Sequence, residues 1–171
     1  MNIGYDYYES PIGKIFVVIS ENGVSKVELF EDKWNDYLNE NHLNRRSDLC
    51  QEVIKQINEY FQGKRKEFTV SIDIEGTDFR KKVWQALSNI PYGVTKSYQE
   101  IAEIIGNPKA VRAIGQANKS NPLPLIIPCH RVIGKSGKLV GYAGSRISTK
   151  KWLLQHEGFE LNELIKETII D

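Results

Sequence analysis

The sequence predicts an α+β protein in which a small N-terminal antiparallel sheet with a helix precedes a mostly helical half. β-branched and aromatic runs separated by turns dominate the first third, whereas apolar residues at helical spacing dominate after residue 76. The charge changes at the same point. Residues 1–75 contain 9 Lys or Arg and 14 Asp or Glu, and residues 76–171 contain 14 and 8. We therefore expect a structural α/β domain over 1–75 and a second domain over 76–171.

Turns and spacing predict the elements of the first domain. Pro11-Ile12-Gly13 and Glu21-Asn22-Gly23 separate three β-rich runs, and Asn-Gly is a typical hairpin turn. Apolar residues then follow helical spacing over 48–62, and Gly63 ends that helix. Cys50 lies on its apolar face, so we interpret it as a packing residue rather than a reactive one. The expected strands span residues 3–8, 14–20, 24–29 and 68–74.

The second domain is expected to open with a helix that Thr77 or Asp78 caps and that ends before Pro91. Its Trp84 lies at helical spacing with other apolar residues. We interpret this tryptophan as a core residue rather than a ligand platform.

A helix-turn-helix is expected next. Ser97 and Glu100 form the S-x-x-E pattern of a capping box, and Gly106 ends the short helix that follows. Asn107 as N-cap and Pro108 as first helical residue suit the start of a second helix, which runs to residue 118. Two short helices joined by a tight turn form this motif.

The second of these helices has two unlike faces. Val111, Ile114 and Ala117 are expected in the core, whereas Lys109, Arg112, Gln116 and Lys119 recur on the opposite face. Ala113 and Gly115 are small, so a nucleic-acid backbone could approach closely. An ordinary amphipathic surface helix would show a similar pattern, but the motif, the basic stripe and the small residues together favour DNA contact.

Composition narrows the class of protein. The net charge is +1, yet Ile104–His156 contains nine Lys or Arg and no carboxylate, which suits either a polyanion-binding surface or a solvated basic face. No apolar run approaches the ~20 residues of a membrane span, and no signal peptide is evident. We therefore expect a cytoplasmic protein. Two isolated cysteines and three histidines show no metal-ligand spacing, so no metal site is expected.

The chemically informative segment is Asn121–Val132. Its three prolines predict a stiff, non-helical connector that leads to Cys129 and His130. A cysteine needs a base or a positive field to become a thiolate. Neighbouring side chains point apart in extended chain, so we expect a water molecule between the two groups, with the next carboxylate downstream, Glu157, behind the histidine. On this pair alone, an unreactive cysteine remains the alternative.

The sequence Ile127-Pro128-Cys129-His130-Arg131-Val132 resembles the active-site motif of the O6-alkylguanine-DNA alkyltransferases. The similarity extends almost continuously over residues 77–158, and residues 1–75 match only loosely. The resemblance implies a ribonuclease H-like N-terminal domain and a winged helix-turn-helix-like domain that binds DNA and carries the active site. The further matching segments are Phe79–Trp84, Ile90–Gly93, Ser97–Ala102, Val111–Gly115, Asn121–Pro124, Gly141–Gly144 and Lys151–Leu154.

The resemblance also implies roles for single residues. Cys129 would accept the alkyl group irreversibly, once per molecule, with His130 as base through water and Glu157 orienting the histidine. Asn121 would support the cysteine turn, and Tyr98 would face the flipped base and help to protonate the leaving guanine.

The resemblance implies double-stranded DNA as the partner, bound through its minor groove with the alkylated guanine flipped out. Arg112 would fill the vacated space, and Ala113, Gly115, Lys109, Gln116 and Lys119 would contact the DNA. The base pocket would be lined by Val132, Tyr142, Ala143 and Gly144. Neither a cofactor nor an obligate protein partner is expected, and the protein is expected to be a monomer. O4-alkylthymine is expected as a further substrate.

One departure and two alternatives accompany this interpretation. Ser145-Arg146-Ile147 is one residue longer than the usual spacing, which affects the expected pocket lining. A non-catalytic lesion-binding module would explain the basic helix-turn-helix but would leave Cys129 without a purpose. A cysteine hydrolase would need an oxyanion site, for which the sequence shows no signal.

Overall fold

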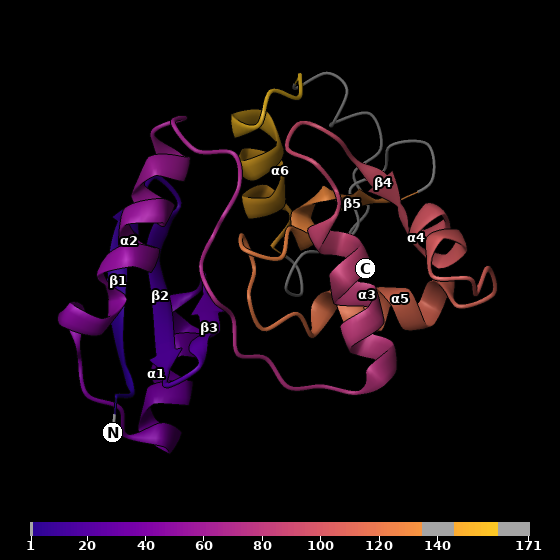
Figure 1. Cartoon of the computed structure of the whole chain (residues 1–171). Coiled ribbons are helices and arrows are strands. Elements are labelled where there is room, and N and C mark those ends of the chain that lie inside the picture. Colours follow the sequence, from indigo (N-terminus) through magenta and orange to yellow (C-terminus); the bar gives the residue numbers. More distant parts are fainter. Residues whose placement is uncertain (1, 135–145, 161–171) are drawn as a thin grey trace. The chain divides into compact units, whose positions relative to one another are not determined.

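The computed structural model describes residues 2–134 and 146–160, which divide into two compact units (Figure 1). The first unit contains residues 1–75 together with 122–126, and the second contains 76–121 together with 127–171. The first part of the proline-rich segment, residues 122–126, therefore belongs to the N-terminal unit, and the chain re-enters the second unit at Ile127.

The first unit is built on an antiparallel sheet of order β1-β2-β3. The strands β1 (Gly4–Ser10), β2 (Gly13–Ser20) and β3 (Gly23–Glu28) correspond to the first three predicted strands. Gly23 has a φ of +141°, and a Cβ there would lie 2.5 Å from the Ser71 carbonyl oxygen, so glycine is required for this turn.

Two helices cover the two faces of this sheet. The predicted helix is α2 (Ser47–Phe61), and Asn58 on it accepts a 2.8 Å hydrogen bond from the Tyr8 hydroxyl of β1. The second helix, α1 (Glu31–Asn41), was not predicted. Its Trp34 is buried and stacks on Phe16 of β2 at 4.8 Å between ring centroids, so tertiary packing stabilises this helix.

The fourth predicted strand, over residues 68–74, is wrong. This segment forms only a single parallel bridge, Val24 with Ile72, through bonds from Val24 N–H to Ser71 O and from Asp73 N–H to Val24 O. The side chain of Gln56 takes the Thr69 N–H at 2.9 Å, which removes one donor from any longer ladder. The segment therefore closes the edge of β3 without extending the sheet.

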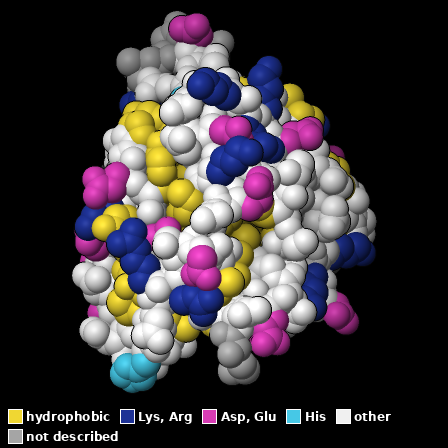
Figure 2. All heavy atoms as spheres, turned by 60° about the vertical axis from the view of Figure 1, so that its left-hand side comes forward, with side chains coloured by type: hydrophobic (Ala, Val, Ile, Leu, Met, Phe, Trp, Pro, Cys, Tyr) yellow, Lys and Arg dark blue, Asp and Glu magenta, His cyan; other side chains and the backbone are white. Residues whose placement is uncertain are grey.

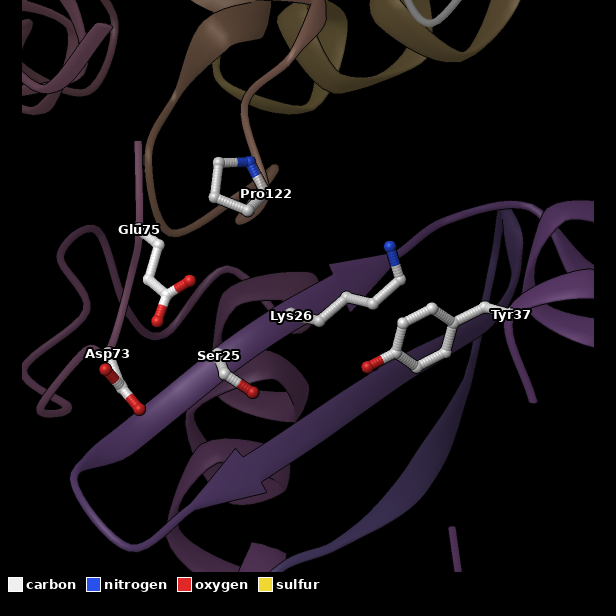
Figure 3. A pocket seen from close by; sticks show the side chains of 6 residues that line it. All are labelled: Ser25, Lys26, Tyr37, Asp73, Glu75 and Pro122. Carbon is white, nitrogen blue, oxygen red and sulfur yellow. The ribbon is translucent and has the colours of Figure 1, made fainter. Parts of the chain in front are cut away.

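A pocket of about 330 Å³ lies in the first unit beside β3 (Figure 3). The Lys26 ammonium lies 4.6 Å from the centre of the Tyr37 ring, and the Asp73 carboxylate accepts a hydrogen bond from Ser20. The pocket contains none of the predicted site residues. Its lining residues are Ser25, Lys26, Tyr37, Asp73, Glu75 and Pro122.

The second unit contains four α-helices in its described part. Thr77 caps α3 (Asp78–Ser88) by accepting the Arg80 N–H at 3.1 Å, and Ser97 and Glu100 form the predicted capping box of α4 (Tyr98–Ile104). The others are α5 (Val111–Lys119) and α6 (Ile147–His156). Two short strands, β4 (Lys96–Ser97) and β5 (Val132–Ile133), pair in parallel.

The predicted start of α5 at Pro108 is wrong. Ala110 donates its N–H to the Asn107 carbonyl at 3.0 Å, which closes a turn, and the helix begins only at Val111. Val111 is consequently 37% exposed rather than in the core, whereas Ile114 and Ala117 are buried as predicted. Lys109, predicted on the helix, lies in the preceding turn.

The core of the second unit joins α3 to the helix-turn-helix. Trp84 is buried, as predicted, and its indole N–H donates to the Ala117 carbonyl of α5 at 2.8 Å. Leu87, Ile101 and Ile114 are fully buried with it. This packing presents the other face of α5 outward. Within residues 2–134 and 146–160, no helix has the length and apolar character needed to cross a membrane.

Candidate active site

Cys129 opens a short 3-10 helix, η1 (Cys129–Arg131), that follows the proline-rich segment. The cysteine is 4% exposed, and its N–H donates to the Ile127 carbonyl at 2.7 Å. The Asn121 side-chain amide donates to that same carbonyl at 2.8 Å. Asn121 therefore contacts the turn just before the thiol, the segment that the family resemblance assigns it to support.

A buried hydrogen-bond network begins at His130, the residue that follows the cysteine. His130 is fully buried, and its Nε2 lies 2.7 Å from Oε2 of Glu157, the C-cap residue that follows α6. Arg131 donates from Nε to Glu157 Oε1 at 2.7 Å and from Nη2 to Oε2 at 3.1 Å. Its Nη1 donates to the Ile90 carbonyl at 2.7 Å. Glu157 is therefore shared between a histidine and an arginine.

The two ionisable partners of this network have perturbed pKa values. Burial opposes the charge of Glu157, but the hydrogen bonds and charges of His130 and Arg131 outweigh it and lower the pKa of that carboxyl to about 2. Burial lowers the pKa of His130, and the Arg131 and Lys150 charges add to this, against the raising effect of Glu157. At neutral pH the network consequently holds an ionised Glu157 and a neutral His130.

The neutral histidine has a defined tautomer. Because the Glu157 carboxylate can only accept, His130 donates its Nε2–H to it, and Nδ1 keeps a free lone pair. Among the residues that the structure describes, no group forms a hydrogen bond with Nδ1. The ring can therefore accept a proton at Nδ1.

Tyr98 and Val132, two further predicted site residues, belong to α4 and β5. Tyr98 is the half-buried first residue of α4, and Val132 is fully buried in β5, where it pairs with Lys96. The Lys150 ammonium of α6 lies 6.0 Å from the centre of the Tyr98 ring. Tyr142, Ala143 and Gly144 lie outside the described residues.

Sequence reasoning missed Arg131 and Lys150. Arg131 follows the predicted pair directly, and only the fold shows that it reaches Glu157. Lys150 is fully buried, and a signal for this was available, because it lies three and four residues before the buried Leu153 and Leu154 on one helix face.

The predicted DNA-binding residues lie on the outward face of α5 or just before it. Arg112, Ala113, Gln116 and Lys119 are exposed, and so is Lys109 in the preceding turn. A Cβ placed on Gly115 would meet no atom within 4 Å outside its own helix turn, so packing within the described chain does not require glycine there. The surface formed by these small residues is therefore available to a partner.

A helix-turn-helix in one unit with a buried cysteine, histidine and glutamate defines a DNA-binding protein with a potential thiol nucleophile. Residues 78–159 match the DNA binding domain of 6-O-methylguanine DNA methyltransferase, and residues 3–74 match its ribonuclease-like domain. The chain belongs to the 6-O-methylguanine DNA methyltransferase family. The two matches confirm the predicted family and fold class.

Relatives and solved structures agree with this assignment. The chain is 43% identical to the constitutive methylated-DNA–protein-cysteine methyltransferase of Bacillus subtilis, over 93% of this chain and 98% of that protein. It is 46% identical to the methylated-DNA–protein-cysteine methyltransferase of Methanosarcina acetivorans, over 90% and 97%. The crystal structure of Mycobacterium tuberculosis O6-methylguanine methyltransferase superimposes with a TM-score of 0.83 at 42% identity, covering 91% of this chain and 92% of that one. A structure of Mycobacterium tuberculosis OGT in complex with DNA gives 0.81 at 42% identity, over 90% and 92%.

Proposed function

We propose that this protein repairs DNA by moving a methyl or larger alkyl group from O6 of guanine to the sulfur of Cys129. The observation that carries the proposal is the buried cysteine followed directly by His130, which forms a buried pair with Glu157 at an Nε2–Oε2 distance of 2.7 Å. The relatives named as methylated-DNA–protein-cysteine methyltransferases support the same reaction. O4-alkylthymine is proposed as a further substrate.

The proposed reaction moves one proton and one alkyl group. The Cys129 thiol proton passes through a water molecule to Nδ1 of His130, and Glu157 stabilises the imidazolium that forms. The thiolate attacks the alkyl carbon, a carbon–sulfur bond forms, and the carbon–oxygen bond breaks with its electron pair on guanine. Tyr98 helps to protonate the guanine, so the proton that left the thiol is balanced by one gained there. The thioether is stable, and each molecule therefore acts once.

DNA would bind on the outward face of α5. We propose that the helix enters the minor groove, that Arg112 occupies the space left by the flipped nucleotide, and that Lys109, Gln116 and Lys119 contact the backbone. The small residues Ala113, which is exposed, and Gly115, which is half-buried, support close approach. By contrast, acidic and basic side chains are intermixed over the face that Figure 2 shows, which is not typical of a polyanion-binding surface.

The two parts of the chain are proposed to have different roles. We propose that residues 1–75 are structural and that 76–171 bind DNA and carry the reaction, with Tyr142, Ala143 and Gly144 lining the base pocket with Val132. The transfer uses a side chain as acceptor and so needs neither a cofactor nor an obligate partner. A cytoplasmic location agrees with a reaction that requires DNA and a reduced thiol.

Intact mass spectrometry after incubation with a methylated duplex tests the proposal. One methyl group should be added per molecule and should map to Cys129. Cys129→Ser should gain no mass while still binding DNA, and Cys50→Ser, which changes the other cysteine, should react normally. Binding without a gain in mass would instead support the lesion-binding module, and continued product formation beyond one equivalent would support a hydrolase.

A further inference from the structure

Arg131 forms a bidentate ion pair with Glu157, the carboxylate behind His130 in the proposed proton transfer. Two guanidinium nitrogens donate to the two Glu157 oxygens, at 2.7 and 3.1 Å, and a third donates to the Ile90 carbonyl at 2.7 Å. The guanidinium also lies 5.6 Å from the centre of the Tyr92 ring. Three hydrogen bonds and buried surroundings fix the arginine, and its rigid fork therefore fixes the rotation of the carboxylate.

This contact changes the charge that His130 experiences. A buried carboxylate alone would favour an imidazolium beside it, because opposite charges attract strongly where water is excluded. Arg131 neutralises that carboxylate at hydrogen-bond distance, so the imidazole faces a pair with no net charge. The positive charge of Lys150 further lowers the pKa of His130. Within the described part of the chain, Arg131 lowers the pKa of both His130 and Glu157, Lys150 lowers that of His130, and Glu157 raises the pKa of the neighbouring Tyr92.

We propose that Arg131 is a positioning residue for the transfer, which orients Glu157 through both carboxylate oxygens and keeps His130 as a neutral base ready at Nδ1. This inference rests on the proposed function. It assigns a role to a side chain that touches neither the thiol nor the DNA in that scheme. Its effect should be greatest under mildly acidic conditions, where an unneutralised Glu157 would cause His130 to take up a proton before the thiol could donate one.

The pH profile of the reaction tests this role. Single-turnover transfer from a saturating methylated duplex, measured from pH 5.5 to 9, should show an acidic limb that Arg131→Met moves upward by about one unit or more. Arg131→Lys keeps the charge but not the fork, so its limb should stay near the wild-type position while its plateau rate falls. A purely structural arginine would lower the plateau and leave the limb of both variants in place, which would overturn the proposal.

Arg45→Met is the matched control. Arg45 also pairs with a buried carboxylate, that of Asp6 at 2.8 Å, but in the N-terminal unit. Its removal should leave the limb unchanged. The rate of Cys129 alkylation by iodoacetamide, in a Cys50→Ser background, should show the same shift for Arg131→Met without any DNA. The iodoacetamide assay uses no DNA, so it tests the role of Arg131 even if the wild-type protein transfers no methyl group.

The wild-type protein provides a test that does not require the variant to fold. Nitrogen NMR of labelled histidine, assigned by loss of the signal in His130→Gln, should show a neutral ring protonated at Nε2 at pH 7. An imidazolium at that pH would refute the proposal.

Discussion

Replacing Glu157 by glutamine removes the charge that His130 and Arg131 share while nearly keeping the size of the side chain. In the folded chain this carboxyl has a pKa of about 2, against an ordinary value of 4.5. Each unit corresponds to about 1.4 kcal/mol, so ionised Glu157 stabilises the fold by about 3 kcal/mol at pH 7. Loss of one partner from a buried ion pair has a cost of about the same size.

The sign of the pH dependence follows from the lowered pKa. The stabilisation by Glu157 is complete above pH 4.5 and is lost as the pH falls through about 2. The wild type and Glu157→Gln should therefore differ by about 3 kcal/mol at pH 7 and by about half as much at pH 3. His130, whose pKa burial lowers, destabilises both proteins below its ordinary pKa and does not itself close this gap.

Urea unfolding followed by circular dichroism measures the effect. With a slope of about 2 kcal/mol per molar, the midpoint of Glu157→Gln should lie about 1.5 M below wild type at pH 7. Glu59→Gln is the control, because Glu59 forms only a partly exposed pair with Arg65 at 3.0 Å and should change stability by less than about 1 kcal/mol. A gap between the two curves that stays constant from pH 7 to pH 3 would refute the reasoning.

Three further predictions concern the DNA-binding face and the core. Arg112→Ala should slow repair in duplex DNA markedly but leave reaction with the free alkylated base nearly unchanged; equal slowing of both would place Arg112 in the pocket or the fold. Lys119→Ala should reduce the slope of log affinity against log salt by up to about 1, and an unchanged slope would remove it from the phosphate contacts. Trp84→Phe removes the indole donor to the Ala117 carbonyl, which keeps the Ser120 hydroxyl as a donor at 3.0 Å, so it should cost about 0.5–1.5 kcal/mol in urea unfolding. A loss below a few tenths would show that this bond contributes little.

Local chemistry made much of the fold predictable from sequence. Asn22-Gly23 and the capping box at Ser97 specify their own backbone geometry, and both are found where predicted. The helix α1 was missed because its N-cap, Phe30, makes no side-chain cap bond and the helix depends on packing of Trp34, with Tyr37 and Leu38, against the sheet. Information of that kind lies in tertiary contacts rather than in the local sequence.

In the candidate site, too, some residues could be paired from the local sequence and others only from the fold. His130 and Glu157 could be paired from sequence, because a base that takes up a proton needs an acid behind it and Glu157 ends a long acid-free stretch. Arg131 could not be placed, since its role depends on α6 returning Glu157 to within 2.7 Å. The late start of α5 was equally hidden, because Asn107-Pro108 suits a turn as well as a helix start.

The segment Pro122–Ile126 makes the N-terminal unit discontinuous in sequence. Pro122 accepts the Val27 N–H at 2.9 Å, and Leu123 and Leu125 are buried. Residues 76–121 are thus an insertion into the first unit, which is completed only when the chain returns to it. A fragment that begins at Gly76 would expose these two leucines and free the residues that precede the thiol. The sheet therefore fixes the position of the chain at residues 122–126, shortly before Cys129.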